Sequence, residues 1–371
     1  MSSPQFDLVI VGCGLYGATV AQHYIEKNRR VLILEKRPHI GGNVYTESID
    51  GIPIHRYGAH IFHTSNEKVW QYINRFATFN HFVNRPKVRY QDRLFSFPIN
   101  LMTLYQLWGV QTPEDAKAKL ESVQIPHPAP QNLEDWILAQ VGDELYQIFI
   151  RGYTQKQWNR PPKNLPAFII KRLPIRLTYD DNYFTDRFQG IPIGGYTPMI
   201  EKMIQGAQVQ LNVDYLKDKP HYDSLAPHIL FTGPIDAYFN TQFGPLAYRS
   251  LRFETQHLPI PDFQGNAVIN YTDPTVPFTR IIEHKHFDQL GPEPLSPTTV
   301  ITTEYPQDWT PKVEPYYPIN DTENNALYQK YKALAQSEPK VHFGGRLAEY
   351  RYYDMHQVIA SAMSWAQKQL Q

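Results

Sequence analysis

Three glycines and one acidic residue near the N-terminus have the types and spacing of a dinucleotide-binding turn. Gly12, Gly14 and Gly17 follow an apolar run at residues 8–11, and Glu35 ends a second apolar run. Gly12 allows a tight turn, Gly14 lets the backbone approach a pyrophosphate, and Gly17 lets the following helix pack closely on the strand. The N–H groups at the start of that helix face the phosphates, and Glu35 accepts hydrogen bonds from a ribose. A glycine turn that holds no ligand is the structural alternative.

A second glycine pair, Gly41-Gly42, follows the basic residue Lys36 just beyond the acidic end of the second run. Glycines at this point let the backbone come close to a second phosphate-bearing or ring-bearing part of a ligand. A simple NAD site does not need this element, whereas the extended form of FAD runs past both turns. The two turns together therefore predict FAD, and an ordinary turn remains the alternative for the second one.

Three histidines, His55, His60 and His63, lie close together in a stretch that also contains aromatic residues. No cysteine or acidic residue accompanies them in the spacing of a metal site, so we expect no metal here. We expect histidine and aromatic side chains beside a flat cofactor ring instead. His63 is predicted to contact the site, whereas a purely structural role stays open for His60.

Arginines and aromatic residues alternate in two segments that are interrupted by prolines, residues 151–162 and 171–184. A guanidinium group binds phosphate oxygens in pairs, and an aromatic ring suits a nucleotide base. The pattern is typical of a nucleotide site. By residue type alone, a solvated basic surface is the alternative.

Composition limits the possible functions. The 371 residues carry 36 Lys+Arg and 36 Asp+Glu, so no overall charge draws the chain to nucleic acid or to a membrane surface. The single cysteine, Cys13, excludes an internal disulfide and fits a reducing compartment. No stretch has the pattern of a signal peptide or of a membrane span. We expect a cytoplasmic protein of two or three structural units.

The elements that must position these residues differ along the chain. Helical spacing of apolar residues is present at residues 66–76 and 101–150, and Asn132 is expected to cap one helix. Strands separated by little helix between residues 268 and 304 indicate an antiparallel sheet. Near the C-terminus, the glycine turn at Gly344-Gly345 is expected to open the last helix.

The glycine and aromatic motifs together resemble those of bacterial UDP-galactopyranose mutases over essentially the whole chain. The first glycine turn is shared by many flavoproteins, whereas the Gly-Tyr-Thr and Glu-Pro-Tyr-Tyr-Pro runs are much more specific. The matching segments are residues 12–17, 41–43, 58–64, 152–158, 314–318 and 344–347. No specific motif is present between residues 208 and 263.

The resemblance implies an isomerase that interconverts UDP-galactopyranose and UDP-galactofuranose and supplies galactofuranose for cell-surface polysaccharide. It implies that FAD acts in its reduced state, with NAD(P)H as the electron source, and that flavin N5 attacks the anomeric carbon as UDP leaves. It also implies a homodimer that binds these UDP-sugars and that binds neither nucleic acid nor a membrane.

Pattern and resemblance together predict the fold class α/β, a Rossmann-like FAD-binding domain with an inserted helical bundle and an antiparallel β-sheet domain. The predicted FAD-binding domain is discontinuous and comprises residues 1–78, 190–235 and 340–371. The helical domain is predicted at residues 100–165. The sheet domain, which would bind the substrate, is predicted at residues 79–99, 166–189 and 236–339.

The same motifs imply roles for individual residues. Arg172 and Arg280 resemble the arginine pair that grips the pyrophosphate, and together with His63 they are the predicted catalytic residues. Further substrate contacts are implied for Asn84, Phe149, Thr154, Trp158, Tyr183, Phe184, Asn270, Tyr317 and Tyr352. Cofactor contacts are implied for Gly12, Gly14, Leu15, Gly17, Glu35, Lys36, Gly42, Asn43, His60, Ile61, His63, Arg346, Tyr352, Asp354 and Met355.

Two other classes of protein remain open. A flavin oxidoreductase of the amine-oxidase or desaturase type shares both glycine turns, but its substrate pocket is usually apolar or amine-binding, unlike the arginine-aromatic segments here. A non-catalytic binding protein of the Rab GDP-dissociation-inhibitor type keeps the glycine turns as a scaffold and holds no flavin. Oxygen consumption with an amine would support the first class, and a colourless protein the second.

Overall fold

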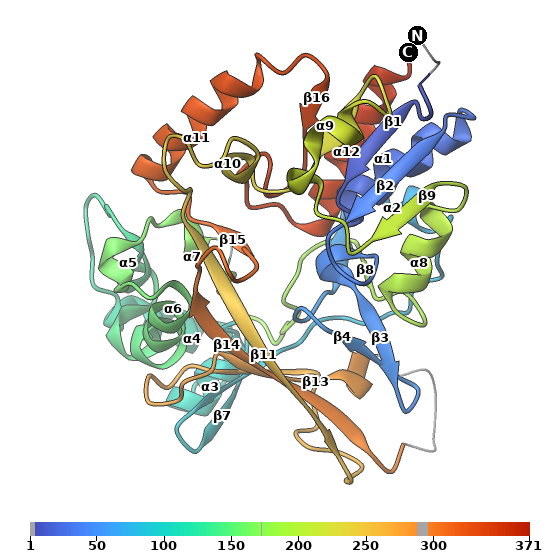
Figure 1. Cartoon of the computed structure of the whole chain (residues 1–371). Coiled ribbons are helices and arrows are strands. Elements are labelled where there is room, and N and C mark those ends of the chain that lie inside the picture. The colour runs from blue at the N-terminus through green and yellow to red at the C-terminus, as the bar shows by residue number, and fades with distance from the viewer. Residues whose placement is uncertain (1–3, 172, 288–295) are drawn as a thin grey trace. The chain divides into compact units, whose positions relative to one another are not determined.

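The computed structural model of the chain describes residues 4–171, 173–287 and 296–371. The chain divides into two compact units (Figure 1). Unit 1 comprises Met1–His81, Asp186–Tyr248 and Pro311–Gln371, and unit 2 comprises Phe82–Thr185 and Arg249–Thr310. The class is α/β, as predicted. The division into three domains stays a prediction, because unit 2 contains both the helical segment and the large sheet.

A parallel sheet of five strands forms the centre of unit 1, in the order β16-β10-β1-β2-β9. These strands are β1 (Leu8–Val11), β2 (Val31–Glu35), β9 (Gln208–Leu211), β10 (Ile229–Phe231) and β16 (Val341–Phe343). Val9 pairs with Leu32 on one side and with Ile229 on the other. The order of the strands therefore reverses at β1, and open parallel sheets bind ligands beyond the carboxyl end of the strands at this point.

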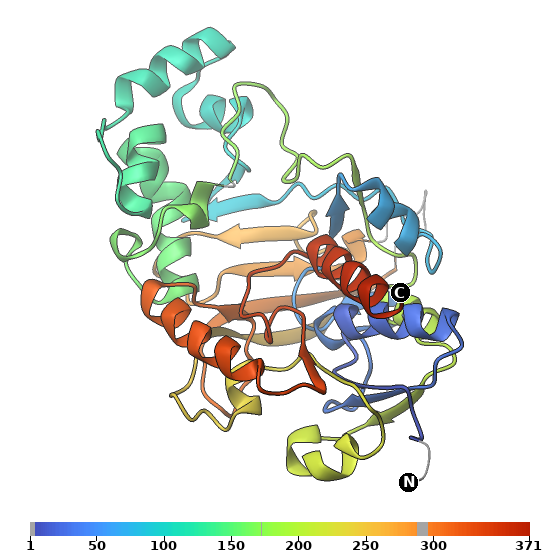
Figure 2. The ribbon, with the colours of Figure 1, turned by 90° about the horizontal axis from the view of Figure 1, so that it is seen from above.

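Helices α1 (Leu15–Glu26) and α12 (Met355–Gln369) pack side by side in unit 1 (Figure 2). All of β2 is buried, and β1 is buried except for Val11, which is partly exposed. Such burial is expected of parallel strands that are covered on both faces. Further elements of unit 1 are η1 (Gly42–Val44), β3 (Thr46–Ile49), β4 (Ile52–His55), β5 (Phe62–Thr64), α2 (Glu67–Ile73), β8 (Phe188–Gly190), α8 (Tyr196–Met203), η4 (Tyr215–Lys217), α9 (Lys219–Asp223), α10 (Ile235–Tyr238), β15 (Tyr317–Pro318) and α11 (Thr322–Ala335). None of the helices in the described ranges is long and apolar enough to span a membrane.

The turn after β16 differs from its prediction, because Gly344 and Gly345 do not open the last helix. Helix α12 begins only at Met355, with Asp354 at its N-cap. Gly344 instead allows close packing, since a Cβ there would lie 2.5 Å from the ring of Tyr16 on α1. The prediction of a helix directly at this glycine turn is therefore wrong.

Unit 2 contains a mixed sheet with the strand order β11-β14-β13-β12-β6-β7. The strands are β6 (Lys87–Tyr90), β7 (Arg93–Ser96), β11 (Tyr248–Leu258), β12 (Val268–Tyr271), β13 (Arg280–Glu283) and β14 (Thr299–Asp308). The neighbouring strands pair in antiparallel fashion, except that β12 pairs in parallel with β6. The predicted antiparallel sheet is thus present, with one parallel pair between strands that no hairpin joins.

The helices of unit 2 follow one another in the segment that the sequence predicts to be most helical (Figure 2). They are α3 (Leu101–Trp108), α4 (Pro113–Val123), α5 (Leu133–Leu145), the π-helical turn η2 (Tyr146–Arg151), α6 (Gly152–Trp158), η3 (Pro162–Asn164) and α7 (Phe168–Lys171), and η5 (His284–Phe287) lies apart from them in the sequence. The Asn132 side chain caps α5 by accepting a bond from Asp135 N at 2.9 Å, as predicted. Apolar side chains such as Leu104, Ile137 and Phe149 form a buried core with neighbouring strand residues.

A buried ion pair follows strand β13 of unit 2. Glu283 accepts hydrogen bonds from the backbone N–H groups of Phe263 and Gln264, both at 2.8 Å. His286 Nε2 lies 3.4 Å from Glu283 and 3.2 Å from Asp262. Burial alone would raise the pKa of Glu283, but His286, the Thr299 hydroxyl and the two backbone N–H groups together lower it to about 2. Burial alone would lower the pKa of His286, but the two carboxylates raise it.

This pair predicts how stability depends on pH. The raised pKa of His286 means that its pairing stabilises the fold fully below the unfolded-state pKa of about 6.5 and is lost as pH rises through the folded-state value. We expect His286→Gln to cost about 2 kcal/mol near pH 6 and to flatten the loss of stability that the wild type shows as pH rises above about 6.5, measured by thermal unfolding. The exposed His81→Gln is the control. Equal pH slopes in the wild type and in His286→Gln would contradict this prediction.

Candidate active site

The first glycine turn joins β1 to α1 in unit 1 and is closely packed. A Cβ at Gly17 would lie 2.1 Å from the carbonyl oxygen of Gly12, and Gly12 itself has a φ of 104°, which favours glycine. Gly14 is the N-cap residue of α1, and no side-chain hydrogen bond caps the helix there. The first N–H groups of α1 are therefore available to an anion, which the helix dipole also favours.

Glu35 lies at the end of β2 and is buried. Its Oε2 accepts a hydrogen bond from Cys13 N at 2.8 Å, and its Oε1 accepts one from Arg37 N at 2.9 Å. Each carboxylate oxygen has a second lone pair, so Glu35 is held in one orientation and can still accept bonds from ribose hydroxyls. Burial raises the pKa of the Cys13 thiol to about 12, so this cysteine is a packing residue and not a nucleophile.

The two glycine turns that the sequence links to one cofactor touch each other. Gly41 N donates to the carbonyl of Cys13 at 2.9 Å. A Cβ at Gly42 would lie 3.0 Å from the Cα of Gly14, whereas a Cβ at Gly14 would meet only Gly42 Cα, at 4.0 Å. The two glycine turns therefore form one continuous backbone surface. The space beside Gly14 is free, as a phosphate that approaches the backbone requires.

Arg37 is a candidate cofactor contact that sequence reasoning missed in favour of Lys36. Lys36 is exposed, whereas Arg37 donates to Asn43 Oδ1 at 3.0 Å and its guanidinium lies 4.4 Å from the ring centre of Tyr57. Arg37 Nη1 is buried and has no hydrogen-bond partner among the described residues. A buried unpaired N–H group indicates a missing acceptor, such as a phosphate oxygen of the cofactor. Lys36 and Arg37 both follow the end of β2, and the sequence did not show which of the two side chains faces the turn.

His60 is held by contacts of its ring and of its backbone. Its Nδ1 lies 2.8 Å from the carbonyl of Gly58, its N–H donates to His55 Nδ1, and its carbonyl accepts a bond from the Tyr196 hydroxyl at 3.0 Å. Burial lowers the pKa of His60 to about 4, so the ring is neutral at pH 7. These contacts support the structural alternative for His60, and a cofactor contact at His60 or at the adjacent, buried Ile61 stays a prediction.

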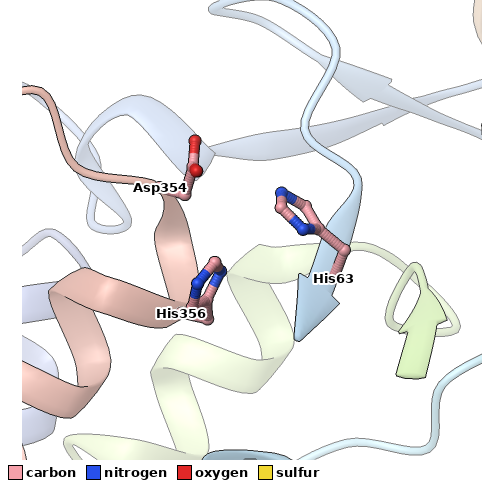
Figure 3. A group of neighbouring side chains, drawn as sticks. All are labelled: His63, Asp354 and His356. Atoms are coloured by element: carbon pink, nitrogen blue, oxygen red, sulfur yellow. The ribbon is translucent and has the colours of Figure 1, made fainter. Parts of the chain in front are cut away.

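His63 lies on β5 and shares a small cluster with Asp354 and His356 at the start of α12 (Figure 3). His63 Nδ1 lies 2.6 Å from Asp186, whose other oxygen accepts a bond from Ser65 Oγ at 2.7 Å. Burial alone would raise the pKa of Asp186, but these two bonds lower it. The carboxylate is therefore ionised and fixes the orientation of the imidazole.

This cluster also has the composition of a metal site. One ligand atom each from His63, Asp354 and His356 lies within 4.8 Å of the others, and two imidazoles with one carboxylate can hold a divalent transition metal. The sequence predicted no metal near His63, because no cysteine or acidic residue accompanies the neighbouring histidines in the spacing of a metal site. Asp354 and His356 come from a distant part of the chain. His63 and Asp354 are also predicted cofactor contacts, so a metal at this cluster would compete with a flavin.

Arg346, Tyr317 and Tyr352 form a second cluster in unit 1. The two tyrosine rings stack with centres 5.5 Å apart, and the Arg346 guanidinium lies 5.4 Å from the ring centre of Tyr352. Arg346 also donates to the backbone carbonyls of Tyr316 and Tyr353. The structure thus brings together three residues that the resemblance places at the site, although they come from distant segments of the chain.

Arg280 is the first residue of β13 in unit 2 and is held by two partners. It donates to the Tyr153 hydroxyl, and its Nε lies 3.3 Å from the buried carboxylate of Glu304. Asn270 on β12 pairs directly with Arg280 across the sheet. Tyr153 is a candidate site residue that sequence reasoning missed, although it belongs to the Gly-Tyr-Thr motif. The guanidinium is therefore positioned in advance for an anionic ligand.

Several predicted substrate contacts gather around one loop of unit 2. The backbone carbonyl of Asn84 accepts a bond from Tyr183 N at 2.8 Å, and the rings of Tyr183 and Phe184 meet edge to face at 5.0 Å. Phe97, which the sequence did not indicate, links Tyr183 to Phe149 through ring contacts of 6.3 Å on each side. Phe149 itself is almost fully buried in the core of unit 2, and its contact with a substrate stays a prediction.

The remaining predicted contacts that the structure describes lie on α6 and at the first residues of α1 and α12. Thr154 is buried on α6, and Trp158, which ends α6, packs partly buried against the core of unit 2. Leu15 and Met355 are the first residues of α1 and α12. Arg172 lies outside the described residues.

Comparison with known proteins shows which family the chain resembles in sequence and in fold. The family model described as UDP-galactopyranose mutase matches residues 148–352, and that of the NAD(P)-binding Rossmann-like domain matches residues 10–76. The chain is 41% identical over 367 residues to a probable UDP-galactopyranose mutase of Klebsiella pneumoniae, which covers 97% of this chain and 94% of that protein. It is 38% identical over 369 residues to a dTDP-fucopyranose mutase of Escherichia coli, with 97% of each chain covered. The solved structure of a reduced UDP-galactopyranose mutase shares its fold, with a TM-score of 0.74, 15% identity, and 99% of this chain and 96% of that chain covered.

The parallel sheet and its glycine turns define a Rossmann-type dinucleotide-binding protein. The family match extends over more than half of the chain, and the Klebsiella pneumoniae relative exceeds 30% identity over nearly the full length. The chain belongs to the UDP-galactopyranose mutase family, and it is an isomerase. This membership favours the mutase interpretation over the flavin oxidoreductase and over the non-catalytic binding protein.

Proposed function

We propose that this chain interconverts UDP-galactopyranose and UDP-galactofuranose and that it does so with bound FAD. The geometry of Arg280 supports this most strongly. Its guanidinium is held between Tyr153 and the buried Glu304, opposite Asn270. A fixed guanidinium that does not depend on ligand for its position is suited to a pyrophosphate that gains charge as its bond to the sugar breaks.

The residues of unit 1 fit FAD as the cofactor. The open N-terminus of α1 suits the pyrophosphate, the two touching glycine turns leave room for it, and Glu35 suits a ribose. The buried Nη1 of Arg37 has no hydrogen-bond partner in the part of the chain that the structure describes, and a phosphate group would provide the acceptor. When bound and reduced, FAD supplies a nucleophilic nitrogen for the anomeric carbon of the sugar.

The other proposed roles belong to side chains of this chain. Arg280, with Arg172 by resemblance, neutralises the departing UDP, and the ring of Tyr183 binds the base. Tyr317 and Tyr352 are proposed to hydrogen-bond the phosphates. His63, oriented by Asp186, is proposed to contact the flavin.

The test is a conversion assay on the purified protein with FAD. We expect the dithionite-reduced protein to convert UDP-galactofuranose into UDP-galactopyranose, followed by chromatography, and the oxidised protein to be inactive. A reduced, flavin-loaded protein without this activity would overturn the proposal. Turnover by the oxidised form would overturn only the proposed role of the reduced state.

A second candidate activity is the corresponding ring contraction of a dTDP-fucose. It is favoured by one relative, the dTDP-fucopyranose mutase of Escherichia coli, which is 38% identical over 97% of both chains. The same assay with dTDP-fucofuranose decides between the two. We expect kcat/KM to be higher for the UDP-sugar, and the reverse order would assign the chain to the second activity.

Several further properties rest on the resemblance alone and stay proposals. These are the homodimer, the cytoplasmic location, the supply of galactofuranose for cell-surface polysaccharide and NAD(P)H as the electron source. Light scattering of the purified protein and flavin bleaching by NADH or NADPH under nitrogen test the first and the last.

A further inference from the structure

We propose that Lys156 is a positioning residue, which ties the hairpin bearing Asn270 and Arg280 to helix α6. The proposal rests on the proposed function, in which Asn270 and Arg280 contact the UDP part of the substrate. It goes beyond that function by assigning a task to a side chain that touches neither substrate nor cofactor.

The ammonium group of Lys156 lies inside the loop that connects β12 to β13. It donates to the backbone carbonyls of Tyr271 at 2.8 Å, Asp273 at 2.9 Å, Val276 at 3.0 Å and Phe278 at 2.9 Å. An ammonium group has three N–H bonds, so four acceptors share three protons. Without this cation, four carbonyl oxygens would face one another. The conformation of the loop therefore depends on the positive charge.

Helix α6 touches the same loop at a second point. A Cβ at Gly152 would lie 2.1 Å from the carbonyl oxygen of Thr272 and 3.1 Å from Pro274. Gly152 and Lys156 are four residues apart and therefore lie on the same face of the helix. Because Gly152 has no side chain, this face of α6 can approach the loop closely. The side chain of Lys156 then extends into the loop and reaches its carbonyl oxygens.

Both ends of the loop lead directly to proposed substrate contacts. Asn270 precedes Tyr271, and Arg280 follows Thr279, whose carbonyl accepts a bond from Tyr271 N at 2.8 Å. Tyr153, one turn before Lys156 on α6, accepts a hydrogen bond from Arg280. A shift of the loop relative to α6 would therefore move the Arg280 guanidinium away from its hydroxyl partner.

The charges around Lys156 are consistent with this role. The carboxylate of Asp273 is engaged by Thr275, accepting bonds from its backbone N–H at 2.8 Å and its hydroxyl at 2.6 Å, so it does not replace the carbonyls as the partner of Lys156. Burial lowers the pKa of Lys156 to about 8, which leaves the ammonium form dominant at pH 7. The cation is thus held mainly by backbone dipoles.

The test compares Lys156→Met, which keeps the length and loses the charge, with Lys163→Met, an exposed lysine of the same unit. Titration with UDP, followed by tryptophan fluorescence, measures binding without any flavin chemistry. We expect Lys156→Met to weaken UDP binding roughly tenfold to a hundredfold, because a displaced Arg280 would lose charge-assisted hydrogen bonds to the pyrophosphate. We expect KM for the UDP-sugar to rise more than kcat falls, and Lys163→Met to behave as the wild type.

Lys156→Ala tests whether the positive charge itself is needed, because a loss of side-chain packing would not be restored by an added cation. The vacated carbonyl cage matches an ammonium-sized ion, as rings of carbonyl oxygens select K⁺ in channels. We expect K⁺ or ammonium to restore UDP binding to Lys156→Ala and Li⁺ to fail. Wild-type affinity in Lys156→Met, or equal effects of all three cations on Lys156→Ala, would overturn the proposal.

A measurement on the wild type covers the case in which both variants fail to fold. Reductive methylation followed by mass spectrometry compares the reactivity of Lys156 with that of Lys163. We expect Lys156 to react more slowly and UDP to slow it further, and equal rates would overturn the proposal. If the wild type itself does not bind UDP, the proposed function fails, which the titration shows separately.

Discussion

Arg280→Ala is expected to lower kcat for UDP-galactofuranose by about two orders of magnitude or more, as for other lost contacts to charge that develops in a transition state. The structure fixes this guanidinium by a bond to Tyr153 and by the buried Glu304. Removing it also leaves the Glu304 carboxylate without its counter-charge. The measurement is steady-state turnover of the reduced protein, combined with UDP titration.

Two variants serve as controls for Arg280→Ala. Arg280→Lys keeps the charge but loses the planar fork, so we expect an intermediate loss. Arg252→Ala removes an exposed arginine from β11 of the same sheet and should leave kcat unchanged. Wild-type turnover in Arg280→Ala would contradict the assignment of the pyrophosphate contact.

Gly14→Ala is expected to abolish FAD binding while the protein still folds. The added Cβ would meet only the Cα of Gly42, at the ordinary contact distance of 4.0 Å, and the φ of −82° suits alanine. The methyl group would nevertheless occupy the space in which the backbone must approach the pyrophosphate. The measurement is the flavin absorbance of the purified protein and of the protein after reconstitution with FAD.

The control is Cys13→Ala, which removes a buried thiol from the same turn and leaves the backbone approach at Gly14 unchanged. We expect this variant to keep its flavin. Full flavin content in Gly14→Ala, with an unchanged unfolding temperature, would show that the pyrophosphate does not lie at this turn. Gly17→Ala is not a substitute, because its Cβ would clash with the Gly12 carbonyl and disturb the fold itself.

Local sequence patterns were sufficient to predict the Rossmann-type strand, turn and helix of unit 1. Gly12, Gly14 and Gly17 act within a few residues of one another, and close packing of strand, turn and helix dictates their spacing. The Asn132 cap of α5 was predictable for the same reason, since a cap bonds to its own helix. The sequence linked the two glycine turns through one extended ligand, but only the structure showed that Gly42 and Gly14 lie against each other.

Long-range contacts were harder to predict. The carboxylate that orients His63 comes from Asp186, and the sequence offers no spacing rule for a pair so far apart. The choice between Lys36 and Arg37 depends on which side of the strand end faces the turn. The bonds from Lys156 to four carbonyls were invisible, because backbone carbonyls carry no sequence signature. The resemblance supplied Arg280, but only the structure showed Tyr153 and Glu304 as its partners.

In the proposed reaction, the bond between the anomeric carbon and UDP breaks and re-forms. Positional isotope exchange tests it most directly. UDP-galactopyranose labelled with ¹⁸O at the oxygen that joins the sugar to the β-phosphate is incubated with the reduced protein and examined by ³¹P NMR. We expect the label to spread to the non-bridging β-phosphate oxygens in the wild type and to do so far more slowly in Arg280→Ala. A label that stays in the bridge while UDP-galactofuranose forms would contradict it.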